Sequence, residues 1–172
     1  MKIQTSTDEN CLSSSDLMPA GDDFPAFLKQ SARILDSYRH WFGKDLVSRN
    51  GSLEDQSELL FNCNQVVLSS GNEPDAILNY GNRSALNLWE MSWATLTSMP
   101  SRLTAQPMER PEREAFLQQV RQNGFITDYA GVRISRTGRR FKISAATVWN
   151  ILDVNGDFLG QAAAFSRWEN LT

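Results

Sequence analysis

Histidine and cysteine are scarce in this chain of 172 residues, which has one histidine, His40, and two cysteines, Cys11 and Cys63. A single histidine excludes any mechanism that needs two of them. Two cysteines cannot build a disulfide framework, and they are too few for a zinc site of the usual cysteine and histidine type. The composition therefore gives no support to metal chemistry or to catalysis by paired imidazoles.

Long apolar runs are also missing. No stretch of 18 apolar residues occurs, so no membrane-spanning helix and no membrane partner are expected. The polar start of the chain lacks the basic and apolar segments of a secretory signal, which predicts a cytoplasmic protein. Its richness in Ser, Thr, Asp and Asn predicts a disordered tail over residues 1–22.

Excess positive charge is absent as well, since the formal net charge is −3. This charge argues against nucleic acid as a partner. One basic run interrupts the pattern, and it contains Arg133, Arg136, Arg139, Arg140 and Lys142. The run is most simply a solvated hairpin tip, although an anion-binding or nucleic-acid-binding patch is the alternative.

Apolar residues recur every three or four positions from Phe24 to Phe42, which predicts a helix with one apolar face. A shorter helix is expected from about Ser52 to Leu60, with Ser52 as its N-cap. Together the two helices form an N-terminal extension over residues 23–60. The first helix has too many large apolar residues to stand free, so we expect it to pack against a sheet or a second copy of the chain.

The pattern changes at Phe61, beyond which short segments alternate in hydrophobicity. A helix from Pro111 to about Gln122 stands between two early strands and three late ones, and the late strands are joined by short turns into a meander. Strands around a helical middle predict an α+β fold in which helices cover one face of an antiparallel sheet. The expected strands span residues 64–69, 77–80, 125–135, 141–152 and 158–165.

Four stretches carry a resemblance to a known family: Leu78-Asn-Tyr-Gly-Asn-Arg-Ser-Ala-Leu, Leu96-Thr-Ser-Met-Pro-Ser-Arg-Leu-Thr-Ala, Gly131-Val-Arg-Ile-Ser and Thr137-Gly-Arg-Arg-Phe. They are similar to the MEKHLA domain, a relative of the PAS domain, in its stand-alone bacterial form. The resemblance covers about residues 24–170. It implies a PAS-like domain over residues 61–172, with five strands in the spatial order 2-1-5-4-3 and helices that enclose a small cavity.

The chain departs from the PAS domains that hold well-known cofactors. PAS domains that bind haem through a histidine draw it from the helix that is expected here at 109–122, and this helix has none. Light-sensing PAS domains use a cysteine within Gly-x-Asn-Cys-Arg, and this motif does not occur. Cys63 lies near the first strand instead. Histidine-ligated haem and cysteinyl flavin are therefore not expected, and the ligand is left open.

Aromatic and polar side chains are expected to meet where the helices cover the sheet, as packing or as the lining of a pocket. Arg102 lies in an otherwise uncharged loop, which favours a buried guanidinium that either holds backbone carbonyls or anchors a ligand. Arg133 alternates with its apolar neighbours, so it faces either solvent or the cavity. The candidate pocket residues are Tyr80, Asn82, Trp89, Arg102, Arg133, Trp149 and Gln161.

The last two strands give an expectation about the inner face of the sheet. Odd-numbered residues from Phe141 to Ile151 are all apolar or small, so we assign them to the inside. Three small residues, Ala145, Ala162 and Ala163, leave room beside the aromatic groups.

The sequence as a whole predicts a non-catalytic sensory or regulatory module that binds a small ligand or a protein partner. We expect a homodimer paired through the helix at residues 24–42. One alternative is a small cone-shaped α+β enzyme with an enclosed pocket, although the chain offers few acids that could converge. A transcription-related interaction module is the other alternative.

Overall fold

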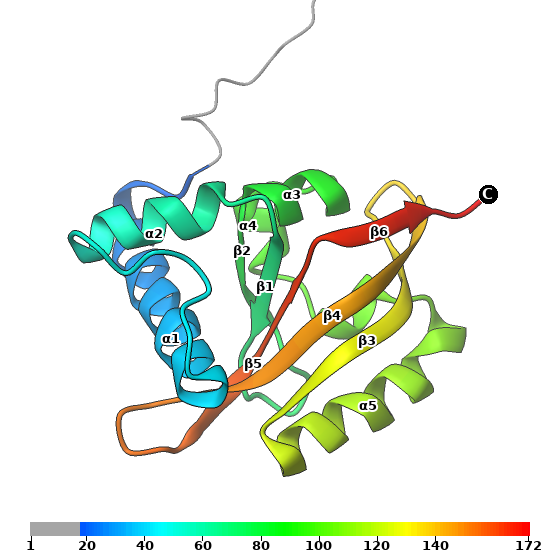
Figure 1. Ribbon diagram of the computed structural model, residues 1–172. Helices are drawn as coiled ribbons and strands as arrows, with labels where there is room; N and C mark the ends of the chain where they lie inside the picture. The colour runs from blue at the N-terminus through cyan, green and yellow to red at the C-terminus, as the bar shows by residue number, and fades with distance from the viewer. Residues whose placement is uncertain (1–17) are drawn as a thin grey trace, which may run out of the picture.

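The protein is built on an antiparallel sheet with helices on both faces (Figure 1). The computed structural model describes residues 18–172. Five strands lie in the order β2-β1-β5-β4-β3, and a short sixth strand pairs with the start of β4, where it continues the row of β5. The predicted order 2-1-5-4-3 is confirmed, whereas the sixth strand was not predicted. The strands are β1 (Val66–Ser70), β2 (Leu78–Gly81), β3 (Phe125–Ile134), β4 (Arg140–Leu152), β5 (Phe158–Phe165) and β6 (Arg167–Asn170).

One face of the sheet is covered by α1 (Phe24–Phe42), which follows a short 3₁₀ turn, η1 (Gly21–Asp23). The Tyr38 and Phe42 rings of α1 contact the Trp149 ring edge-on, at centroid distances of 5.1 Å and 6.2 Å. Two α1 side chains also bond to the backbone of β4: the Trp41 indole donates to the Asn150 carbonyl at 2.8 Å, and the Ser37 hydroxyl accepts from the Leu152 amide at 2.9 Å. The predicted helix is confirmed, and it packs against the sheet of its own chain.

The helix α2 (Leu53–Asn62) packs beside α1 (Figure 1). It begins as predicted at Ser52, whose side chain accepts from the Asp55 amide while the Asp55 carboxylate accepts from the Ser52 amide. Residues 1–17 of the predicted tail lie outside the described residues. No helix within residues 18–172 has the length and apolar character needed to cross a lipid bilayer.

The opposite face is covered by the helices that lie between β2 and β3. Trp89 at the end of α3 contacts Phe141 and Phe165 of the sheet edge-on. Phe116 of α5 stacks on Tyr129 of β3 with a centroid distance of 3.8 Å. These segments are α3 (Arg83–Trp89), α4 (Trp93–Leu96), η2 (Ser101–Thr104), η3 (Pro107–Glu109) and α5 (Arg110–Asn123).

Two bulges in β3 and β4 decide which side chains face these helices. The pairing shifts between Ile126 and Tyr129, where β3 has the extra residue, and shifts back between Tyr129 and Gly131, where β4 has it. Asp128 and Ala145 take positive φ values of 61° and 52° at these places. A bulge re-aims the side chains that follow it. Because each strand has one extra residue, the two strands return to their original register. Within each strand, however, the side chains before and after its bulge no longer follow one strict alternation between the two faces.

The predicted inner face of β4 is therefore right for its first half and wrong for its second. Phe141 and Ile143 face α3 and α5 as expected, but beyond the bulge Ala146 and Val148 line the space under α5. Trp149 packs against α1 on the other face. Strict alternation failed because Ala145 itself is exposed at the bulge.

Candidate functional site: a cavity under α5 with two buried arginines

A cavity of about 80 Å³ lies between α5 and the sheet. Most of its wall is apolar and comes from three central strands and β2, with Leu68, Leu78, Val148, Ala163 and Phe165 among the lining residues. Ala163 contributes space because its neighbours across the sheet are Leu68 and Val148. The polar part of the wall is concentrated where α5 faces β3.

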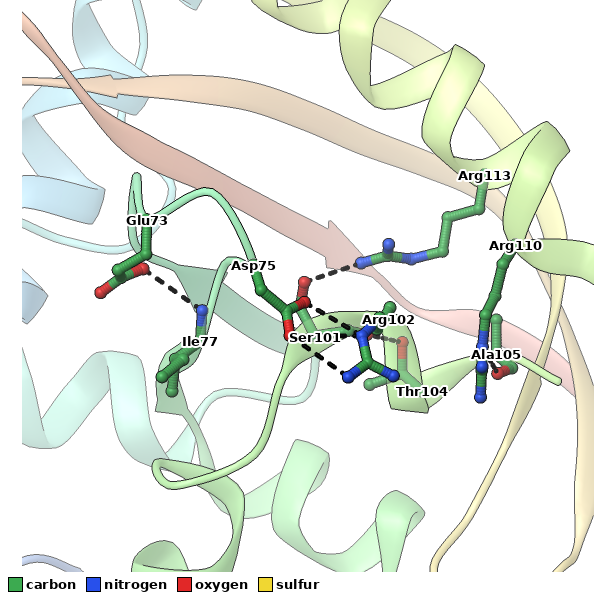
Figure 2. Close-up of polar contacts among 9 residues, drawn as sticks. All are labelled: Glu73, Asp75, Ile77, Ser101, Arg102, Thr104, Ala105, Arg110 and Arg113. Atoms are coloured by element: carbon green, nitrogen blue, oxygen red, sulfur yellow. Dashed lines mark hydrogen bonds and ion pairs between the residues drawn. The ribbon is translucent and has the colours of Figure 1, made fainter. Parts of the chain in front are cut away.

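Arg113 reaches into this polar part from α5, and only 9% of its surface is exposed. It occupies the inner stripe of the helix, three, four and seven residues before Phe116, Leu117 and Val120. Its guanidinium Nη2 donates to the Ser101 hydroxyl at 3.1 Å (Figure 2). That is the one hydrogen bond that the five N–H groups of Arg113 make with residues 18–172.

The position of Ser101 is fixed by the loop that contains it. The Ser101 amide donates to the Ala76 carbonyl at 2.8 Å, and Ile77 bridges to Pro100. The Thr104 hydroxyl donates to the Ser101 carbonyl at 2.7 Å (Figure 2). Ser101 is thus a fixed acceptor at the cavity, beside the edge strand β2.

Arg133 enters the same part of the cavity from β3, and 8% of its surface is exposed. Its Nη2 donates to the Tyr129 hydroxyl at 3.0 Å, and its Nη1 donates to the Val132 carbonyl at 2.9 Å. The guanidinium carbon lies 5.5 Å from the centroid of the Tyr129 ring. Tyr129 therefore holds Arg133 by a hydrogen bond and by a cation–π contact.

Gly131 makes room for this arrangement. A Cβ atom at this position would fall on the Tyr129 hydroxyl and would lie 2.9 Å from Nη1 of Arg133. The tyrosine ring is rigid and is already stacked on Phe116, so it could not yield without moving the arginine. A residue without a side chain is needed at the place where the two side chains cross.

Neither buried arginine forms an ion pair with a described residue, since the four salt bridges within residues 18–172 all involve other arginines. Burial, and to a smaller extent the nearby charge of Arg133, lower the pKa of Arg113 to about 10. A pKa near 10 still leaves the group protonated at neutral pH. The guanidinium groups of Arg113 and Arg133 thus share one mostly apolar cavity, and no carboxylate within residues 18–172 pairs with either of them.

Two of the other predicted residues, Trp89 and Gln161, also line the cavity. The Gln161 amide donates to the Leu117 carbonyl at 2.9 Å and to the Asn150 side chain at 3.3 Å. It therefore connects α5 to the sheet. The Trp89 indole N–H is buried and has no hydrogen-bond acceptor within residues 18–172.

Arg102 differs from its expected setting. Its guanidinium forms a two-pronged ion pair with Asp75, with N–O distances of 3.0 Å and 3.2 Å, and its side chain is 47% exposed (Figure 2). The expectation of a buried guanidinium was wrong because η2 turns Arg102 outward and its neighbour Ser101 inward. A charge at the cavity is supplied instead by Arg113, which lines it and bonds to Ser101 (Figure 2).

The structure places the remaining three predicted residues elsewhere in the core. Asn82 is the N-cap of α3, where its side chain accepts from the Val67 and Ala85 amides and donates to the Gln65 carbonyl at 2.7 Å. Tyr80 is fully buried and stacks on Phe27 of α1. Trp149 faces α1, as described above. These three side chains serve packing and capping.

The basic run does not form one patch. Arg133 points inward, whereas Arg139 donates to the Leu88 carbonyl at 2.7 Å and lies over the Trp168 ring. Arg140 pairs with Glu109 at 3.4 Å. The run is therefore divided between the cavity, α3 and η3.

Sequence analysis missed Arg113, Tyr129 and Ser101. A signal for Arg113 was present, because it continues the apolar stripe of Phe116, Leu117 and Val120 toward the start of the helix. A charged side chain on the apolar face of a helix breaks the local pattern, and such departures are expected mainly at functional sites. Tyr129 gave a signal only relative to Arg133, because residues four apart in one strand share a face.

The sheet order and the position of the cavity define the fold of the PAS domains, the class that includes many sensory modules. Solved structures agree. The PAS domain of a protein from Colwellia psychrerythraea has a TM-score of 0.58 at 13% identity, over 70% of this chain and 97% of that one. A light-oxygen-voltage domain described in connection with a flavin analogue has a TM-score of 0.54 at 14% identity, over 69% and 85%. An RNA-binding light-oxygen-voltage receptor has a TM-score of 0.60 at 13% identity, over 75% of this chain and 36% of that one.

The family model of the MEKHLA domain matches residues 28–170, and the chain belongs to this family. The expected family is thereby confirmed. No curated protein matches the chain.

The likeness to light-oxygen-voltage domains raises the question of a flavin. Pockets for ligands of drug or cofactor size have volumes of roughly 300–1,000 Å³. The cavity of about 80 Å³ is several times smaller, because Arg113, Phe116 and Leu117 of α5 occupy the space under the helix. Cys63 lies outside this lining, and burial raises the pKa of its thiol. The residues present do not fit a flavin.

Proposed function

We propose that this protein is a non-catalytic sensory module that binds a small anion in the cavity under α5. The observation that supports the proposal best is the pair of buried arginines, Arg113 and Arg133, which have no carboxylate partner among residues 18–172. An uncompensated charge in an apolar setting destabilises a fold by several kcal/mol. A negatively charged ligand would remove this penalty.

The location of the two cations suggests how binding would be communicated. Arg113 belongs to α5 and Arg133 to β3, so an anion held by both would connect the helix to the sheet. The side-chain amides of Asn150 and Gln161 already connect the helix to the sheet, because they donate to the carbonyls of Arg121 and Leu117. They bond to the second half of α5, whereas Arg113 is near its start. Ligand binding would therefore fix the first half of the helix.

Thermal unfolding at pH 7 in a buffer without small anions tests the proposal, with acetate, butyrate, citrate and inorganic phosphate each added in turn. At least one of these anions is expected to raise the unfolding temperature of the wild type and to leave that of an Arg113→Met/Arg133→Met double variant unchanged. Arg102→Met is the matched control, because it removes an exposed arginine, and it should respond like the wild type. An equal response in all three proteins, or none in the wild type, would contradict the proposal.

We also propose that two copies pair through the N-terminal extension. The apolar face of α1 is occupied by the sheet of its own chain, so pairing would use its outer side and α2, where Leu59 is 44% exposed. Light scattering after size-exclusion chromatography tests this, with Leu59→Glu as the disrupting variant. A mass of one chain, 19.4 kDa, for the wild type would refute the dimer.

A further inference from the structure

The chemistry of the cavity wall points to a narrower ligand class than "anion". We propose that the ligand is a small monocarboxylic acid with an apolar body of about three carbons, whose carboxylate lies between Arg113 and Arg133. This inference rests on the function proposed above. It adds the chemical identity of the ligand's charged group and the size of its apolar part. Each of these two features follows from a different part of the wall.

The charged end follows from the number and shape of the donors. A guanidinium presents a planar fork that matches the two oxygens of a carboxylate. Arg113 uses one of its five N–H groups and Arg133 uses two in bonds within residues 18–172, so both retain donors for a ligand. Two forks are enough to satisfy two oxygens.

A phosphate or sulfate would be satisfied less well. It has four oxygens around its centre, and those that point away from the arginines would face a mostly apolar wall. Leu68, Val148 and Phe165 offer no donor there, and the Trp89 indole N–H could satisfy at most one oxygen. A buried acceptor without a donor is destabilising by about 1–3 kcal/mol, or more when it is charged. The apolar side of the cavity therefore selects against an ion that is polar in every direction.

The size of the apolar end follows from the volume. An apolar cavity of about 150 Å³ in a protein core binds benzene, which has six carbons. By proportion, the cavity of about 80 Å³ has room for roughly three carbons. Ala163 sets this limit because it is the small residue between Leu68 and Val148 on the cavity side of the sheet.

The surroundings also give the ligand a route. A surface groove of about 320 Å³ runs between α5 and β3, and Arg113, Tyr129 and Arg133 line both this groove and the cavity. Glu109, Glu112 and Lys142 also line the groove, so the guanidinium groups would hold an arriving carboxylate against the repulsion of two acidic side chains. Its apolar end could then pass between them into the cavity, and the carboxylate would remain at the arginines.

Calorimetric titration of the full chain with acetate, butyrate, octanoate and inorganic phosphate tests the inference. Butyrate is expected to bind at least tenfold more tightly than the other three. Arg133→Met should weaken butyrate binding at least tenfold, and Ala163→Leu should abolish it by filling the cavity. If phosphate binds as tightly as butyrate and Ala163→Leu leaves it unchanged, the carboxylic acid is refuted while the anion-binding function stands. If no anion binds, both proposals fail.

A second variant keeps the size argument testable if Ala163→Leu does not fold. Val148→Ala enlarges the cavity, so the preferred acid should become longer, with hexanoate gaining at least threefold relative to butyrate. Val67→Ala is the matched control, because this fully buried valine is paired with Ala164 and does not line the cavity. Equal hexanoate-to-butyrate ratios in the two variants would show that Val148 does not limit the ligand.

Discussion

Replacing Arg113 by methionine should make the protein without ligand more stable, although most substitutions in a core do the opposite. Burial and the charge of Arg133 lower the pKa of Arg113 from the ordinary value of arginine to about 10. One pKa unit corresponds to about 1.4 kcal/mol, so the charged form is disfavoured in the folded state by about 3 kcal/mol. The variant loses the hydrogen bond to Ser101, which contributes about 1 kcal/mol. The net gain is about 2 kcal/mol, or roughly 4–8 °C in unfolding temperature for a chain of this size.

The pH dependence of this difference follows from the same pKa. Below pH 10 the arginine is charged in both the folded and the unfolded state, so the penalty is fully present. Between pH 10 and the ordinary pKa of arginine the unfolded state binds more protons than the folded one, and wild-type stability rises relative to the variant. The gain of Arg113→Met should therefore be constant from pH 6 to 9 and should shrink above pH 10. Comparing the two proteins cancels the titration of most other groups, although the smaller influences of Glu114, Tyr129 and Arg110 remain.

Denaturant unfolding of wild type, Arg113→Met and Arg102→Met at pH 7 measures these free energies. Arg102→Met should change stability by no more than about 1 kcal/mol, because its ion pair with Asp75 is half exposed. A buried Arg102 would have implied a larger loss of stability than this half-exposed ion pair does. A loss of more than 1 kcal/mol in Arg113→Met would refute the reasoning, since it would show that the guanidinium stabilises the fold on its own.

Three further predictions concern the framework around the cavity. Asn82→Ala should lower the free energy of unfolding in urea by about 2–4 kcal/mol, because it removes the α3 cap and leaves the Val67 amide without its acceptor. A decrease of less than about 1 kcal/mol would contradict this role. Trp149→Ala should lower the free energy of unfolding by about 3–5 kcal/mol in the same assay. It should also speed amide hydrogen exchange in α1, and unchanged exchange there would count against the packing of α1 on Trp149. Removal of residues 1–42 should expose Tyr80 and Trp149 and produce aggregates in size-exclusion chromatography, and a soluble, equally stable product would contradict it.

Much of the fold could be predicted because each element is encoded locally. The helix from Phe24 to Phe42 follows from its apolar spacing, and the start of α2 follows from the capping box at Ser52. The three late strands follow from alternation and from the turn residues between them. The short strand Arg167–Asn170 was missed because all four residues are exposed and show no periodic pattern.

The candidate site was predicted only in part because it depends on tertiary features. Arg133, Trp89 and Gln161 line the cavity, whereas Arg102 lies outside it. Whether an arginine in an irregular loop points inward is decided by the turn that holds it, and the sequence does not encode this turn in any simple pattern. The contribution of Arg113 required the knowledge that the inner stripe of α5 faces a cavity and not a filled core.

The bulges explain why alternation could not identify the cavity face, and they also connect the fold to the proposed function. Without the extra residue near Asp128, Phe125 and Ile126 would change face relative to Tyr129 and Arg133, and Phe125 would turn away from Trp41 and Phe42 of α1. Without the matching residue near Ala145, Val148 would point toward α1 and Trp149 would enter the space under α5. A tryptophan there would fill the cavity, which is only about 80 Å³. The paired bulges therefore keep the cavity open and let Phe125 and Trp149 pack against α1, while the register of the two strands at their far ends is unchanged.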